Sequence, residues 1–174
     1  MKTAVYSDEI FLRHDTGGHP ENSGRLRAIT NRLAASPVVS AVSLRKASAA
    51  TLDDVELVHG RDYVRVLEEA ALTGQPYLHT PDCVVSHDTY AAALHAAGAL
   101  VEAVHEVDAG RIDNAFVACR PPGHHAEQLH AMGFCFFNNV AISAQVLTQH
   151  LGYERVLIFD FDVHHGNGTQ HTFE

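Results

Sequence analysis

The sequence predicts an α/β protein in which a parallel sheet is flanked by helices. Residues 114–119 and 155–160 are two short apolar runs, typical of buried strands. A helix predicted over residues 138–151 lies between them, and together the three form a βαβ unit. Such a unit implies parallel strands and a right-handed crossover.

The rest of the chain also alternates strands and helices, without internal repeats. Leu26, Ile29 and Leu33 recur at helical spacing on one face. Ser86 is the expected N-cap of the longest helix, and residues 74–81 are predicted to form a loop. We expect strands over residues 3–6 and 41–44, and helices over residues 20–35, 51–58, 62–72 and 87–107.

Length and composition are those of a folded domain. The 174 residues are 46% apolar and 19% charged, which is ordinary for a soluble protein. A net charge of -9, with twelve scattered Lys and Arg residues, argues against a nucleic-acid partner. No membrane segment or export signal is readable, and we therefore expect a cytoplasmic protein. Acidity suits a cationic substrate, although solubility alone explains it more simply.

The most informative stretch lies near the end of the chain, where four apolar residues lead into Asp160, Asp162 and His164. Residues two apart on a strand point to the same side, so these three side chains are expected to form one polar row. Carboxylate oxygen and imidazole nitrogen are common Zn²⁺ ligands, and a catalytic site supplies three of them. Asp162 and His164 are therefore candidates for two of the three.

A second motif occupies residues 120–127 (Arg-Pro-Pro-Gly-His-His-Ala-Glu), directly after the apolar run 114–119. Its prolines stiffen the backbone and its glycine permits a tight bend. His124 and His125 are thus presented rigidly, as acid/base catalysis requires. Sites in α/β sheets gather beyond the carboxyl ends of strands. This topology predicts that the histidine pair lies near Asp162 and His164.

These motifs resemble those of the zinc-dependent histone deacetylases and their relatives, the acetylpolyamine amidohydrolases and acetoin-utilisation proteins. The resemblance covers the whole chain, and Asn167 is similar to the class II branch. It rests on residues 14–21 (His-Asp-Thr-Gly-Gly-His-Pro-Glu), 120–125, 133–139 (Gly-Phe-Cys-Phe-Phe-Asn-Asn) and 160–170 (Asp-Phe-Asp-Val-His-His-Gly-Asn-Gly-Thr-Gln).

The resemblance implies a proton-transfer pair. His125 would act as general base and then acid, with Asn167 as its partner. His124 would be an electrostatic partner that donates a hydrogen bond to Asp160. A carboxylate favours the charged form of His124, whereas the neutral amide of Asn167 leaves His125 free to lose its proton.

The resemblance also implies ligands and a substrate channel. Asp162 and His164 would bind Zn²⁺. A structural K⁺ would be held by Asp160, Asp162 and the backbone carbonyl of His164. Gly133 and Phe134 would line a narrow channel for an acyl-lysine-like arm, and Asp82 would contact the substrate at its rim.

In that family the third metal ligand and an oxyanion-stabilising tyrosine come from later segments. The 174 residues are therefore expected to be the N-terminal part of a single catalytic domain with the arginase/deacetylase fold. We expect weak metal retention and little deacetylase activity from these residues alone. An exposed apolar sheet edge, and possible homo-oligomers, are expected as well.

The leading hypothesis is a zinc-dependent deacetylase acting on acetyl-lysine or acetylpolyamine substrates. One alternative is a catalytically inactive fragment, or a remnant of the fold that binds acylated ligands. Another is an arginase-like dinuclear manganese hydrolase, which shares the architecture. Each motif also has a purely structural explanation, as a hydrogen-bonded strand end or a rigid turn.

Overall fold

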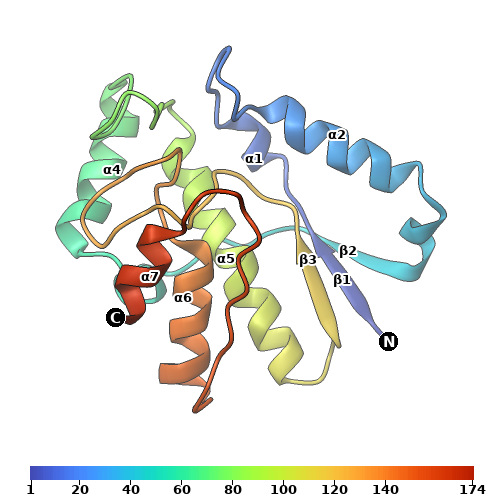
Figure 1. Ribbon diagram of the computed structural model, residues 1–174. Coiled ribbons are helices and arrows are strands. Elements are labelled where there is room, and N and C mark those ends of the chain that lie inside the picture. Colours follow the sequence, from blue (N-terminus) through green and yellow to red (C-terminus); the bar gives the residue numbers. More distant parts are fainter.

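The computed structural model describes residues 1–174 as a three-stranded parallel sheet with helices packed around it (Figure 1). In chain order its elements are β1 (Thr3–Tyr6), α1 (Ile10–Arg13), α2 (Ser23–Ala34), the 3₁₀ turn η1 (Pro37–Ala41), β2 (Val42–Arg45), α3 (Leu52–Glu56), α4 (Arg61–Thr73), α5 (Thr89–Asp108), β3 (Asn114–Val117), α6 (Asn139–Gln145), the π turn η2 (Val146–His150) and α7 (Asn167–Phe173).

The sheet has the strand order β2-β1-β3, and both pairings are parallel. Thr3 on β1 lies opposite Val42 on one side and Asn114 on the other. The central strand is the buried one, because Ala4 and Tyr6 have no exposed surface. The predicted α/β class with a parallel sheet is therefore confirmed.

The predicted helices form, with boundaries set by local capping. The Asn22 side chain accepts a hydrogen bond from the Gly24 N–H at the start of α2, and Thr51 and Asp54 form a capping box at α3. The predicted cap of the longest helix is wrong. The helix α5 begins at Thr89 with Asp88 as N-cap, because the Ser86 hydroxyl instead accepts from the Asp15 N–H at 3.0 Å.

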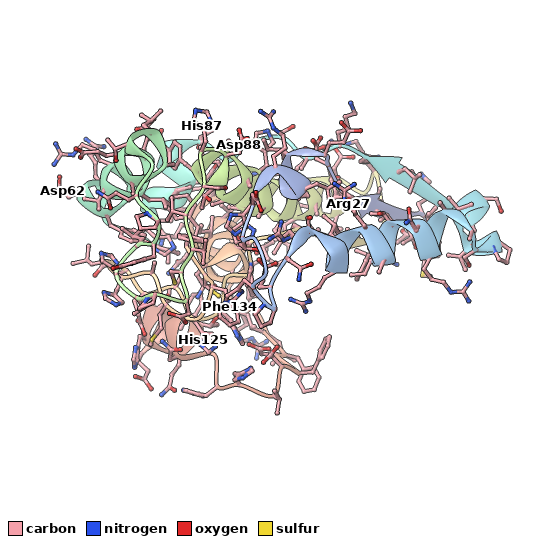
Figure 2. All side chains as sticks on the ribbon, turned by 90° about the horizontal axis from the view of Figure 1, so that it is seen from above. Arg27, Asp62, His87, Asp88, His125 and Phe134 are labelled. Atoms are coloured by element: carbon pink, nitrogen blue, oxygen red, sulfur yellow. The ribbon has the colours of Figure 1, made fainter.

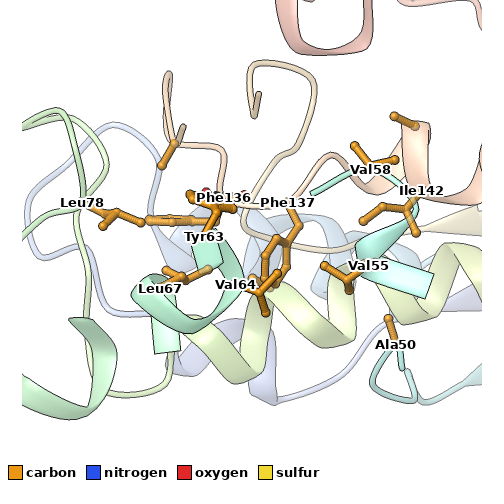
Figure 3. Packing of buried hydrophobic residues seen from close by; sticks show 14 of the residues in the cluster. Ala50, Val55, Val58, Tyr63, Val64, Leu67, Leu78, Phe136, Phe137 and Ile142 are labelled. Carbon is orange, nitrogen blue, oxygen red and sulfur yellow. Dashed lines mark hydrogen bonds between the residues drawn. The ribbon is translucent and has the colours of Figure 1, made fainter. Parts of the chain in front are cut away.

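The main hydrophobic core lies between α4, α5 and α6, and it fixes the segment that leads into α6. Phe136 and Phe137 are fully buried beside Tyr63 and Val64 (Figure 3). The Tyr63 hydroxyl donates a hydrogen bond of 2.6 Å to the Phe136 carbonyl. Burial of the two phenylalanine side chains stabilises the fold by about 2 kcal/mol each. This core therefore positions the loop that precedes them in the chain.

One predicted strand is absent. Residues 155–160 run as an irregular ribbon between η2 and α7 (Figure 1), and no backbone hydrogen bond joins them to β3. Leu157 is 91% exposed and Phe159 82% exposed. The apolar pattern is that of a buried strand, but a strand forms only where a partner satisfies its backbone groups. The helix predicted over residues 138–151 is also divided into α6 and the π turn η2.

A cavity of about 680 Å³ separates this segment from the sheet. Its lining is mostly apolar and comes from α5, β3, α6 and residues 153–156. The expected exposed apolar surface is therefore present, although on an irregular segment rather than on a strand. None of the helices combines the length and apolar character needed to cross a lipid bilayer.

We predict that this exposed apolar surface drives self-association. Light scattering of the purified chain is expected to show species larger than the monomer, since contiguous exposed apolar surface favours association. The double variant Leu157→Ser, Phe159→Ser should shift the distribution towards monomer, and Leu72→Ser, an exposed leucine on α4, serves as the control. A monomeric wild type would contradict the prediction.

Candidate active site

The loop after β3 is anchored by a buried ion pair. The Arg120 guanidinium donates to both carboxylate oxygens of Glu21, at 2.7 and 2.8 Å. It also donates to the backbone carbonyls of Phe11, at 2.8 Å, and His14, at 2.6 Å. Because both charged side chains are only 3% exposed, removing either would leave an unpaired buried charge. This pair ties the start of the histidine loop to the N-terminal segment.

The next turn of the loop packs directly on the start of α6. A Cβ atom on Gly123 would lie 2.7 Å from the Asn139 nitrogen and 2.7 Å from the Phe137 carbonyl. No side chain fits in that space, so only glycine permits this approach. The following histidines are thereby held against the buried phenylalanine segment.

The histidine pair makes the two side-chain contacts that the sequence predicts. The two rings lie 4.1 Å apart between centroids. His124 donates from Nδ1 to Asp160 Oδ2 at 2.8 Å, and His125 Nδ1 lies 2.6 Å from Asn167 Oδ1. Two segments that are separated by 36 to 42 residues in the chain therefore meet through two imidazole hydrogen bonds.

Asp162 and His164 lie at the same place. The His164 ring is 6.0 Å from the His125 ring between centroids, in an edge-on arrangement. Its Nδ1 donates to Asp162 Oδ1 at 2.9 Å. The predicted convergence of the histidine pair with these two side chains is therefore present in the structure.

The predicted polar row on a strand is wrong, because local hydrogen bonds replace it. Asp160 Oδ1 accepts from the Asp162 N–H at 3.0 Å, and Asp162 Oδ1 accepts from the His164 N–H at 2.8 Å. Aspartate side chains that bond the backbone two residues ahead favour turns over strands. The three side chains gather at the site through these turns.

Both aspartates are held in their charged form. Partial burial acts to raise the pKa of Asp160, but hydrogen bonds from the His124 ring and the Asp162 N–H lower it below its usual value. The backbone N–H of His164, together with its ring, lowers the pKa of Asp162. Both groups are therefore available as anions near neutral pH.

Gly133 packs directly against the His125 ring, and Phe134 follows it in the chain on the same side of the molecule as His125 (Figure 2). Gly133 has φ +55°, and a Cβ there would overlap the His125 ring. Phe134 also has a positive φ, of 69°, and its ring packs edge-on against His19 at 4.6 Å. A non-glycine residue in this region is strained. The strained backbone directs the Phe134 ring towards His19.

Asp82 is not brought into hydrogen-bond contact with the histidine pair. Its neighbour Cys83 is fully buried and lies against the Phe134 backbone. Asp82 is therefore adjacent in the chain to a residue that contacts the Phe134 backbone.

Comparison with known proteins agrees with this geometry. The histone deacetylase domain family matches residues 19–174. This chain belongs to the histone deacetylase family.

Similar proteins are spread across animals and plants. The chain is 34% identical to histone deacetylase 9 of Homo sapiens, over 98% of this chain and 20% of that protein. Identity is 36% to histone deacetylase 4 of Caenorhabditis elegans, over 99% and 23% of the two chains. It is 37% to histone deacetylase 5 of Arabidopsis thaliana, over 99% and 28%.

Among solved structures, the HDA15 HD domain superposes with a TM-score of 0.92 at 38% identity. It covers 99% of this chain and 50% of that one. This deacetylase-family chain thus has the arginase/deacetylase-like fold, and it spans between a fifth and just over a quarter of the curated relatives it matches.

This deacetylase-family chain supplies part of a zinc donor set. No group of three His, Cys, Asp or Glu side chains converges closely enough to hold a metal ion. Asp162 and His164 do present adjacent oxygen and nitrogen donors, 2.9 Å apart. These are donor types that Zn²⁺ accepts, so the two residues fit as part of a zinc shell.

The three cysteines contribute no reactive thiolate. Burial raises the pKa of Cys119 to about 12 and raises that of Cys135 further. The Cys135 thiol donates to the Gly133 carbonyl, with Sγ and O 3.3 Å apart. All three thiols are unpaired, and burial keeps each of them from acting as a nucleophile.

Two residues at the site carry no role in the sequence-based prediction. The Glu127 carboxylate contacts Asn167 Nδ2 and accepts from His171 Nδ1 at 2.9 Å. The buried His59 ring lies 2.9 Å from the Glu127 carbonyl through Nδ1, and its Nε2 accepts from the Asn138 N–H at 2.8 Å. Glu127 is the last residue of the motif 120–127, so the sequence could have indicated a role for it. His59 belongs to no motif, and nothing in the sequence singles it out.

We predict that acid destabilises the fold through His59 and His14. Burial lowers the pKa of each from 6.5 to about 4, so the unfolded state binds more protons between these values. The contribution of each neutral histidine to the free energy of unfolding is therefore fully present above pH 6.5. It falls as the pH is lowered towards 4, by at most ~3 kcal/mol per histidine. Urea unfolding at pH 7 and pH 5 measures this loss.

The variant His59→Gln should show a smaller loss of stability between the two pH values. The control His87→Gln, at a side chain that is 79% exposed, should leave the loss unchanged. An equal loss in His59→Gln and wild type would show that His59 does not contribute to acid sensitivity.

Proposed function

We propose that this chain supplies the proton-transfer pair and two metal ligands of a zinc-dependent deacetylase. Two hydrogen-bonded pairs, His124–Asp160 and His125–Asn167, lie beside Asp162 and His164. This arrangement is the observation that supports the proposal most. Family membership supports an amide hydrolase that removes acetyl groups. The substrates we propose are acetyl-lysine or acetylpolyamines.

In this proposal His125 moves the proton. The Asn167 amide oxygen only accepts hydrogen bonds, so the His125 ring donates to it from Nδ1. Its Nε2 is left without a proton, ready to take one from water and later give it to the leaving amine.

His124 has a different task. Its Nδ1–H is directed at the charged Asp160 carboxylate at 2.8 Å, which fixes the orientation of the ring. The ring lies 4.1 Å from the His125 ring between centroids, and in this proposal it stabilises negative charge that develops on the substrate. The pair therefore divides proton transfer and charge stabilisation between two neighbouring rings.

Asp162 and His164 would hold the zinc ion. When bound, Zn²⁺ supplies Lewis acidity towards an amide carbonyl and a water molecule. We also propose that Asp160, Asp162 and the His164 carbonyl help to hold K⁺, because carbonyl and carboxylate oxygens suit a hard cation. The turns that hold these carboxylates are already hydrogen-bonded without an ion.

Gly133 and Phe134 would form the wall along which the acyl arm reaches His125. Gly133 lets the backbone lie directly against the imidazole, because a Cβ there would overlap the ring, and the Phe134 ring offers an apolar surface. An extended alkyl chain of the lysine or polyamine type would suit a narrow passage built along these two residues. A net charge of -9 suits a cationic substrate in the same way.

The metal ligands are tested by zinc binding. Competition with a chelator is expected to show at least ~10-fold weaker Zn²⁺ binding in Asp162→Asn and His164→Ala, because each removes a donor. His165→Ala removes an exposed histidine next to the proposed ligand and should leave the affinity unchanged. If His165→Ala weakened binding and His164→Ala did not, the ligand assignment would be wrong.

The general base is tested in a protein that contains these residues together with the remainder of the catalytic domain, by acetate release from labelled acetyl-lysine peptide and acetylpolyamine with Zn²⁺ supplied. His125→Ala is expected to lower the rate by ~10² to 10⁴-fold, the range for loss of a general base. His87→Ala, on the opposite side of the molecule (Figure 2), should match the wild type. If His124→Ala abolished turnover and His125→Ala left it intact, the two roles would be exchanged.

The same assay separates the alternatives. Binding of the acetylated substrate without any acetate release would favour an acyl-ligand-binding protein. Urea release from arginine with Mn²⁺ would favour the arginase-like hydrolase.

A further inference from the structure

We propose that Glu127 is a positioning residue, which orients the Asn167 side-chain amide and thereby selects the tautomer of His125. This role rests on the proposed function, because the tautomer affects turnover only if His125 is the base. The contacts that indicate it are between side chains of this chain and involve no metal.

The Asn167 amide has its two ends in different surroundings. Its Nδ2 faces the Glu127 carboxylate, the His125 carbonyl at 3.4 Å and the Met132 sulfur at 4.0 Å. All three are acceptors. Its Oδ1 faces only the His125 ring, at 2.6 Å from Nδ1. A flipped amide would direct its oxygen at the carboxylate, with no proton between the two acceptors.

The amide orientation determines which nitrogen of His125 carries the proton. With the oxygen towards the ring, Nδ1 must be the donor and Nε2 is free to act as a base. With the NH₂ group towards the ring, Nδ1 would have to accept, and the proton would lie on Nε2. In that tautomer Nε2 already carries a proton and cannot act as the base.

Glu127 is itself held from several directions. His171 Nδ1 donates to its carboxylate oxygens at 2.9 and 3.0 Å. Its carbonyl contacts the buried His59 ring at 2.9 Å, and its N–H donates to the His130 carbonyl at 2.9 Å. The side chain is 24% exposed. A carboxylate fixed in this way imposes one amide orientation on Asn167.

Tight packing keeps Asn167 within reach of this carboxylate. A Cβ atom on Gly168 would overlap the Ala126 carbonyl, so the start of α7 lies directly against the backbone between His125 and Glu127. The Thr169 N–H also donates to the His124 carbonyl at 3.2 Å. The amide can therefore rotate, but it cannot move away.

The test is the tautomer of His125 in the ¹⁵N-labelled 174-residue chain, without metal or substrate. Long-range ¹H–¹⁵N spectra at a pH where the ring is neutral distinguish a protonated Nδ1 from a protonated Nε2. The wild type is expected to be mainly Nδ1–H. Glu127→Ala is expected to lower the Nδ1–H to Nε2–H ratio by about tenfold, the effect of losing a charge-assisted hydrogen bond.

Two further variants make the result decisive. Glu127→Gln keeps a neutral acceptor at the same position, so a smaller fall in the ratio is expected, and it provides the answer if Glu127→Ala does not fold. Gln128→Ala alters the adjacent exposed side chain in the same turn and should leave the ratio at the wild-type value.

An unchanged ratio in the folded Glu127 variants, or a wild type that is mainly Nε2–H, would overturn the proposal. A changed ratio together with Zn²⁺ binding that neither Asp162→Asn nor His164→Ala weakens would reject the proposed function while leaving the positioning effect established. The two failures are therefore distinguishable.

Discussion

The site depends on two hydrogen bonds from imidazole rings to a segment that the sheet does not hold. Residues 155–164 form no backbone ladder with β3, so the sheet does not position them. His124 reaches Asp160 and His125 reaches Asn167, and these contacts bring the proposed ligands Asp162 and His164 beside the histidine pair. The contacts that position the segment are thus the contacts on which the proposed chemistry depends.

The loop that carries His124 and His125 is held rigidly by other contacts. The buried Arg120–Glu21 pair holds the start of the histidine loop, and Phe136 and Phe137 bury the segment that follows it. His59 joins the two, because it contacts the Glu127 carbonyl and accepts from the Asn138 N–H. A rigid platform carrying the base therefore meets a segment held mainly by side-chain hydrogen bonds, which is the part expected to open most readily.

Much of the fold was predictable because local signals agreed with tertiary packing. The strands at residues 3–6 and 114–117, and the helices begun by Asn22 and Thr51, follow from periodicity and capping. The irregular structure of residues 155–160 was not predictable, because their apolar pattern is that of a strand. A strand needs a neighbour, and local pattern does not record whether one is present. The division of the predicted helix 138–151 into α6 and a π turn also lacks a local signal.

For the site, the sequence by itself determined the chemical inventory: two adjacent histidines on a stiff loop, carboxylates and a histidine at alternate positions, and an asparagine suited to His125. The motifs carry this information because each is contiguous in the chain. Only the tertiary structure decided that Glu127 lies behind Asn167, that His59 supports its backbone, and that Asp82 does not contact the histidine pair. Such relations join residues far apart in the chain, and packing rather than local preference sets them.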